Sequence, residues 1–226
     1  MSTATSTPLD RSAAITRSLL GWGVVAGPFY FAVGLILALT SPGFDLSRHP
    51  LSLLMLGEFG WLQRANLILA ALMTLAAAVG MLRAIRNGRG LALGVLTATY
   101  GVALILSAVF PPDPMAGFPA GSPEGIVSVS GILHMLFGAV GFAAAAAAAF
   151  TYAGWSRRVG SRRRSVLGVV LGVVILAGFF GGAALSTSAF GVGMLWVAVV
   201  AVWTWLAVAS AHVYSWSPHP LAGQRA

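Results

Sequence analysis

Residues 41–66 read SPGFDLSRHPLSLLMLGEFGWLQRAN and join two long apolar segments of a chain that otherwise consists mainly of Ala, Leu, Val and Gly. Five ionisable side chains, Asp45, Arg48, His49, Glu58 and Arg64, fall within this one stretch. Proline and glycine follow directly after Ser41, and the proline after His49 holds that residue in an extended conformation. The stretch is therefore expected to be a polar loop that ends one apolar helix and begins the next.

The composition places the chain in a lipid bilayer. Of its 226 residues, 58% are hydrophobic and only 8% are charged, and the mean hydropathy is +0.89; a soluble domain carries about 25% charged residues. Six apolar segments are each long enough to cross a bilayer as a helix of about 20 residues. We expect an all-α membrane protein, a six-helix transmembrane bundle over residues 18–216, with spans at 18–40, 61–82, 91–110, 128–152, 166–185 and 190–214. Residues 1–17 are expected to be a disordered tail, and 217–226 a second tail.

The arginines predict how the bundle is oriented. All thirteen Lys and Arg residues are arginines, and only Arg48 and Arg64 lie on the side of the two long loops. Because cytoplasmic loops carry the excess of basic residues, both termini are predicted to be cytoplasmic, in a bacterial cell membrane. The remaining eleven basic residues lie on the predicted cytoplasmic side: Arg11, Arg17, Arg83, Arg86, Arg89, Arg157, Arg158, Arg162, Arg163, Arg164 and Arg225.

Several classes of function are disfavoured by the residue types. The chain has no cysteine, which excludes disulfides, thiolate catalysis and cysteine-bound metal clusters. The basic run SRRVGSRRRS at residues 156–165 is interpreted as a topology anchor that attracts anionic lipid, since no aromatic residues alternate with it as in nucleic-acid sites. We expect no nucleic-acid partner, no cofactor and no metal. Stripes of small residues permit self-association into oligomers.

Polar residues of both long loops, and of the outer ends of the second and fourth apolar segments, emerge on one side and can converge there. A charged or polar group at the edge of the membrane normally faces protein or a cavity. The candidate outer-face site consists of Asp45, His49, Ser52, Gln63, Arg64, Asn66, Asp113, Glu124 and His134.

Three functions remain open for this set. In the first, Arg64 pairs with a loop acid and the polar groups only tie the loops to the bundle, because an unpaired buried ion is costly. In the second, Arg64 and His134 lie beneath a lid of loops and bind a lipid or a small anionic ligand. In the third, a hydrolase-like enzyme uses His134 or His49 as base and Ser52 as nucleophile. No HxxxH, HExxH or GxSxG pattern is present, so a non-enzymatic binding site is our interpretation.

Three motifs are distinctive: HPLSLLMLGEFGWLQRANLILA at 49–70, PPDPMAGFPAGSPEG at 111–125 and HMLFGAVGF at 134–142. Together they resemble the bacterial integral membrane family called domain of unknown function 998. The resemblance covers the first four apolar segments and is most specific at Trp61, Gln63, Arg64 and Asn66. It implies a multi-pass membrane protein and supplies no activity. Leu53 stands where the family often has an acid, which weighs further against the enzyme.

Overall fold

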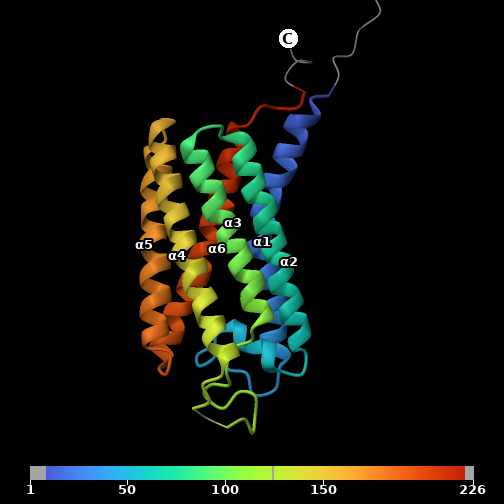
Figure 1. The fold of residues 1–226 in the computed structure, drawn as a ribbon, viewed down its shortest axis with the longest axis vertical. Coiled ribbons are helices and arrows are strands. Elements are labelled where there is room, and N and C mark those ends of the chain that lie inside the picture. The colour runs from blue at the N-terminus through green and yellow to red at the C-terminus, as the bar shows by residue number, and fades with distance from the viewer. Residues whose placement is uncertain (1–8, 124, 222–226) are drawn as a thin grey trace, which may run out of the picture.

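Six long helices stand side by side in the computed structural model, which describes residues 9–123 and 125–221 (Figure 1). Their bounds are α1 Arg11–Thr40, α2 Gly60–Ala84, α3 Gly88–Val109, α4 Val129–Arg158, α5 Arg162–Ala184 and α6 Ala189–Trp216. A short 3₁₀-helix, η1 Leu51–Leu56, lies between α1 and α2. Each long helix is apolar and long enough to cross a membrane, and no strand occurs in the described residues. The predicted all-α, six-helix membrane fold is confirmed.

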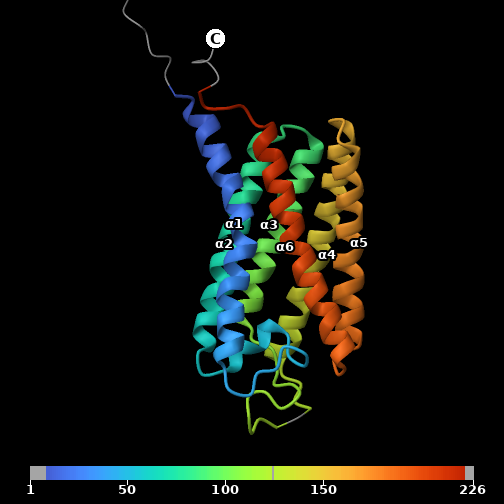
Figure 2. The same cartoon turned by 180° about the vertical axis from the view of Figure 1, so that it is seen from behind.

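The helices form a closed ring in sequence order. Each packs on its neighbours in the chain, and α6 returns to pack on α1 as well as α5, which Figure 2 shows from behind. Helices suit a lipid bilayer because each backbone polar group must be hydrogen-bonded within the membrane, and a helix makes these bonds within its own segment. Contacts across the ring are sparse, with α6 touching α2 and α4 only slightly. The ring can therefore hold a space between its helices.

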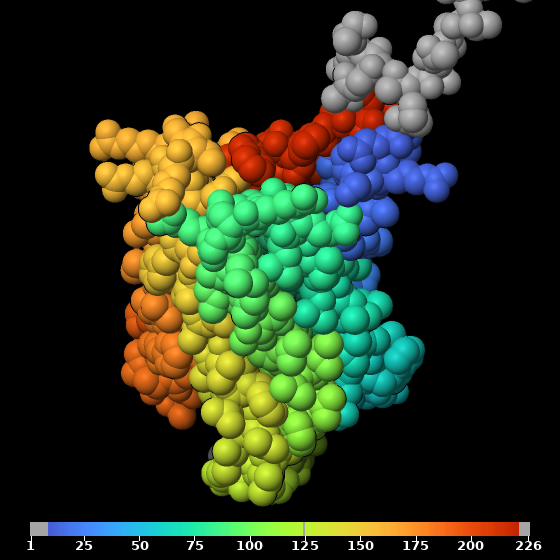
Figure 3. Space-filling model, turned by 45° about the horizontal axis from the view of Figure 1, so that its top comes forward, coloured from blue at the N-terminus to red at the C-terminus, as the bar shows by residue number. Residues whose placement is uncertain are grey.

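The turns divide the molecule into two ends. The termini end carries residues 9–10, 85–87, 159–161 and 217–221, and Figure 3 looks obliquely onto it. The loop end carries residues 41–59, 110–123, 125–128 and 185–188. Ten of the described arginines belong to the termini end, whereas Arg48 and Arg64 belong to the loop end.

The first helix begins earlier than expected. We predicted a tail over residues 1–17, but residues 11–17 are helical; residues 1–8 lie outside the described chain. Asp10 caps this helix by accepting a hydrogen bond from the Ala13 amide at 3.0 Å. Arg17 donates to the carbonyls of Tyr214 and Ser217 at 3.1 and 3.0 Å and lies over the Tyr214 ring. The polar first turns of α1 are helical because the end of α6 supplies hydrogen-bond partners and an aromatic ring for Arg17. A pattern of apolar residues along the sequence does not reveal such contacts.

The two helices α5 and α6 approach each other very closely. A methyl group added at Gly178 would lie 2.9 Å from the carbonyl oxygen of Met194 and 3.0 Å from the Ala198 side chain. Small residues at such a contact let two helix backbones pack directly in lipid. This seam closes one side of the ring.

Candidate functional site

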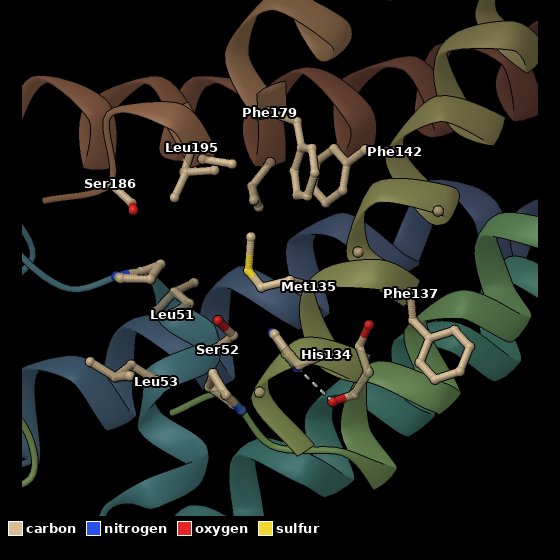
Figure 4. A pocket seen from close by; sticks show the side chains of 18 of the residues that line it. Leu51, Ser52, Leu53, His134, Met135, Phe137, Phe142, Phe179, Ser186 and Leu195 are labelled. Atoms are coloured by element: carbon tan, nitrogen blue, oxygen red, sulfur yellow. Dashed lines mark hydrogen bonds between the residues drawn. The ribbon is translucent and has the colours of Figure 1, made fainter. Parts of the chain in front are cut away.

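A cavity of about 520 Å³ lies within the loop half of the ring (Figure 4). This volume falls within the range of about 300–1,000 Å³ found for small-molecule sites. Its walls come from all six long helices, with α2 contributing only Leu67. The helix η1, the loop between α3 and α4 and the turn between α5 and α6 cover it at the loop end. Most of the lining is apolar, and several polar side chains lie near the loop end.

A layer of aromatic rings forms the floor of this cavity, one from each of five helices: Tyr30, Trp203, Tyr100, Phe142 and Phe179. Their ring centroids follow one another at 5.2, 5.9, 6.2 and 4.3 Å. Such pairs contribute about 0.5–1.5 kcal/mol each beyond the area they bury. On every helix that lines the cavity at several positions, the aromatic residue is the one farthest from the loop end. The aromatic floor therefore separates the cavity from the termini half of the bundle.

The lid over the cavity is the 3₁₀-helix η1, which turns Leu51, Ser52 and Leu53 toward it. The leucines are buried, so this short apolar helix plugs the loop end of the bundle. The Trp196 indole on α6 donates to the carbonyl of Leu46 at 3.0 Å and ties the loop before the lid to the wall.

His49 fastens the two long loops to one another. Its Nδ1 accepts from the backbone N–H of Asp45 at 2.9 Å, so the ring proton is on Nε2, which donates to the carbonyl of Ala116 at 3.2 Å. The ring also packs on Phe44 and Phe118, with centroids 5.3 and 5.5 Å away. Both ring nitrogens make hydrogen bonds and the side chain is only 2% exposed, so His49 holds the two loops together. It does not line the cavity.

The Asp45 carboxylate acts locally in its own exposed turn. It accepts from the hydroxyl and the amide of Ser47 at 2.7 and 2.8 Å. The Ser47 hydroxyl, followed by the Ser47 amide, stabilises the charged form and lowers the pKa of Asp45. Asp45 does not line the cavity.

Asp113 lines the cavity, but its carboxylate is used to cap α4. It accepts from the Ser128 amide at 3.0 Å and from the Ser128 hydroxyl at 2.5 Å, and that hydroxyl accepts from the Gly131 amide at 3.0 Å. An anion at a helix N-terminus is favoured by the unpaired amides and the helix dipole. A side chain at Gly131 would overlap the carboxylate, since its first carbon would lie 2.0 Å from Asp113 Oδ2.

His134 is held in one tautomer by the end of α3. Its Nδ1 lies 3.0 Å from the carbonyl oxygen of Ser107 and 2.9 Å from that of Phe110. Carbonyls only accept, so Nδ1 carries the proton and Nε2 of the neutral ring is left with a lone pair. Both carbonyls are free because the residues four positions later, Pro111 and Pro114, have no N–H to offer. Figure 4 shows the far edge of the His134 ring directed into the cavity toward Ser52.

The other predicted residues lie away from the cavity. Gln63 and Asn66 are fully buried near α1, where the Asn66 amide donates to the Tyr30 carbonyl at 3.1 Å and to Gln63 Oε1 at 3.2 Å. Arg64 is half-buried and makes no ion pair or hydrogen bond with any residue that the structure describes. Glu124 lies outside the described residues.

Of the nine predicted residues, the cavity therefore brings together Ser52, Asp113 and His134. Within residues 9–123 and 125–221, no group of three potential metal-binding side chains occurs. Sequence reasoning missed the aromatic floor, because single aromatic residues in apolar spans are common and nothing in their spacing shows that five helices bring them together.

A family model described as "Protein of unknown function (DUF998)" matches residues 24–212. No curated protein and no solved structure matches the chain.

Proposed function

The chain belongs to this DUF998 family of proteins of unknown function, and we propose that it binds a single-chain, lipid-like amphiphile in the cavity above the aromatic floor. The observation that carries this proposal is the polarity of the cavity. Its walls are largely apolar and its floor is made of aromatic rings, whereas Ser52 and His134 lie at its lid end. An alkyl chain would lie over the aromatic rings and a polar end group would meet these two side chains.

Lipid fits this site better than a small anion does. Arg64, the cation expected to meet an anionic ligand, is not among the described residues that line the cavity. The site would also have to strip water from an anion in largely apolar surroundings, which is costly without a partner charge. The aromatic floor closes the cavity toward the termini end, so the geometry favours binding over passage through the bundle.

The orientation of the site is part of the proposal. Ten described arginines at the termini end support a cytoplasmic position for that end and an extracytoplasmic position for the cavity. Because the chain has no cysteine, labelling of a variant with one introduced cysteine shows on which side of the membrane that position lies. Arg48→Cys should react with an impermeant maleimide on intact cells and Arg158→Cys should not. The reverse pattern would overturn the orientation.

The binding proposal is tested by extraction and mass spectrometry of lipid that remains on the purified protein. Ala183 lines the cavity, whereas Ala177 on the same helix α5 is exposed outside it. Ala183→Phe should fill part of the cavity and reduce the retained amphiphile, while Ala177→Phe should retain it as the wild type does. Equal retention by both variants, or none by the wild type, would refute the proposal.

A hydrolase is the second candidate, supported by one observation. Ser52 and His134 line the same cavity and lie across from each other in Figure 4, and His134 Nε2 is free to take a proton. The partners of Nδ1 are two backbone carbonyls, which can orient the ring in place of a carboxylate. A fluorophosphonate probe should then label the wild type and not Ser52→Ala. Absence of labelling would leave binding without catalysis.

A further inference from the structure

The cavity can distinguish one lipid-like ligand from another only by the ligand's polar head group. This inference rests on the proposed binding function. Lipid tails are about as apolar as the walls of a membrane protein, so an alkyl chain gains little by leaving the bilayer for the cavity. A hydrogen bond made inside the cavity does distinguish one head group from another. The relevant groups are therefore those beside His134 and Ser52.

His134 presents an acceptor to the cavity. Its single ring proton is on Nδ1, where the Ser107 and Phe110 carbonyls both receive it. The neutral ring is therefore able only to accept at Nε2, and its ligand must donate. The residue is 9% exposed, which is consistent with an edge that reaches the cavity from an otherwise buried ring.

The charges around this acceptor disfavour an anion. Among the described residues that line the cavity, Asp113 is the one with a carboxylate, and no arginine is present. The Ser107 and Phe110 carbonyls add the negative end of the α3 dipole. A carboxylate or phosphate head group would meet like charge with no cation to offset it.

A cationic head group is disfavoured for a different reason. The Asp113 carboxylate already accepts two hydrogen bonds from Ser128 at the start of α4. A cation would lose its hydration in a largely apolar cavity without a free carboxylate to replace it. An uncharged donor meets neither difficulty.

We propose that the polar end of the ligand is an uncharged hydroxyl that donates a hydrogen bond to His134 Nε2. The ligand class is a long-chain alcohol or a glycerol ester with a free hydroxyl. The Ser52 hydroxyl on the lid provides a second polar contact that can accept or donate. Of the two ligand classes expected from the sequence, a lipid or a small anion, the histidine acceptor favours an uncharged lipid-like molecule.

Two substitutions separate binding from structure at this position. In His134→Asn the side-chain amide can occupy the place of Nδ1 and keep its bonds to the two carbonyls, while the Nε2 acceptor is lost. In His134→Ala both are lost. His134→Asn should therefore unfold close to the wild-type temperature, and His134→Ala should unfold earlier.

The experiment measures competitive binding by native mass spectrometry to delipidated full-length protein in gentle detergent. The probes are dodecanol, monododecanoylglycerol, dodecanoate and dodecylammonium, which share one chain length and differ in head group. The wild type should bind the two hydroxyl probes about tenfold more tightly than the charged probes, the ratio expected from one buried hydrogen bond. His134→Asn should lose this preference.

Each contrary outcome has a distinct meaning. Equal binding of all four probes, or tighter binding of dodecanoate, would overturn the inference and leave the binding function intact. Retained preference for the hydroxyl probes in His134→Asn would also overturn it. Failure of every probe to bind the wild type would refute both proposals. If His134→Asn does not fold, the order of the four probes on the wild type decides the question.

Discussion

Replacement of Gly131 by alanine tests whether the α4 cap depends on the close approach of Asp113. The added carbon would lie 2.0 Å from Asp113 Oδ2 and 2.4 Å from Asp113 Cγ. Carbon cannot remain at these distances, so the carboxylate must leave its position. Its hydrogen bonds to the amide and hydroxyl of Ser128 should then break.

The expected cost can be worked out from these contacts. Loss of the two bonds to a charged acceptor should cost about 3 kcal/mol, which is more than the value of up to about 2 kcal/mol for loss of a helix cap alone. Alanine is favoured over glycine in a helix by up to about 1 kcal/mol. Gly131→Ala should therefore lower the free energy of unfolding by about 2 kcal/mol, and Asp113→Ala should lower it by about 3 kcal/mol.

The double variant Asp113→Ala/Gly131→Ala tests whether the two single effects arise from the same contact. With Asp113→Ala in place, Gly131→Ala no longer meets a carboxylate, so the double variant should lose only about 2 kcal/mol. The sum of the single effects is about 5 kcal/mol, so the coupling energy should be about 3 kcal/mol, at the upper end of values for residues in contact. Equilibrium unfolding in mixed micelles with increasing dodecyl sulfate would measure all four proteins.

Gly154→Ala provides the matched control in the same helix. The nearest atom to an added carbon there is Arg89 Nε at 3.6 Å, an ordinary contact, so this variant should be neutral or slightly stabilised. Additive effects of the two substitutions, or a Gly131→Ala protein as stable as Gly154→Ala, would refute the reasoning.

Three further predictions concern the loops and the helix seam. His49→Ala should lower the free energy of unfolding by about 2 kcal/mol, because one hydrogen bond within the first loop, to Asp45, and one to the second loop, at Ala116, are lost; unchanged protease resistance of the second loop would contradict this. Gly178→Ala should cost about 1–3 kcal/mol by forcing α5 and α6 apart, whereas Gly193→Ala, with open space around it, should be neutral in the same unfolding assay. The pKa of Asp45 is lowered in the fold by Ser47, so the turn is stabilised above the unfolded pKa of about 3.9 and that contribution disappears as pH falls through the lower folded value. Hydrogen exchange of this loop, corrected for intrinsic rates, should rise on acidification in the wild type and show no such step in Asp45→Asn.

The two histidines at the loop end, His49 in a loop and His134 in α4, show where sequence reasoning stopped. Both His49 and His134 were expected at one polar site, yet His49 joins two loops and His134 faces the cavity. Their sequence neighbours do not distinguish these roles. The protonated nitrogen is chosen in each case by a partner far along the chain, the Ala116 carbonyl for one and the Ser107 and Phe110 carbonyls for the other.

The sequence nevertheless indicates one feature of the surroundings of His134, the free carbonyl groups at the end of α3. Prolines at 111 and 114 leave the carbonyls of Ser107 and Phe110 without helical partners, so a donor was required somewhere near the end of α3. Its identity depended on how α4 packs beside α3. Arg64 is the opposite case, because its position in an apolar helix favoured an ion pair that the described residues do not supply.

The residue pattern along the chain is enough to predict a bundle of six apolar helices in which all arginines except Arg48 and Arg64 lie away from the long polar loops. That information is local, since apolar length and charge placement depend only on neighbouring residues and on the energy of transfer into lipid. The tertiary structure alone decided that the helices close into a ring, that five distant rings form the aromatic floor, and that three of the nine predicted residues share the cavity. These features depend on the rotation of each helix about its own axis. Because lipid and helix surfaces are similarly apolar, that rotation is set by small-residue contacts and individual hydrogen bonds between helices, which no periodicity of a single segment contains.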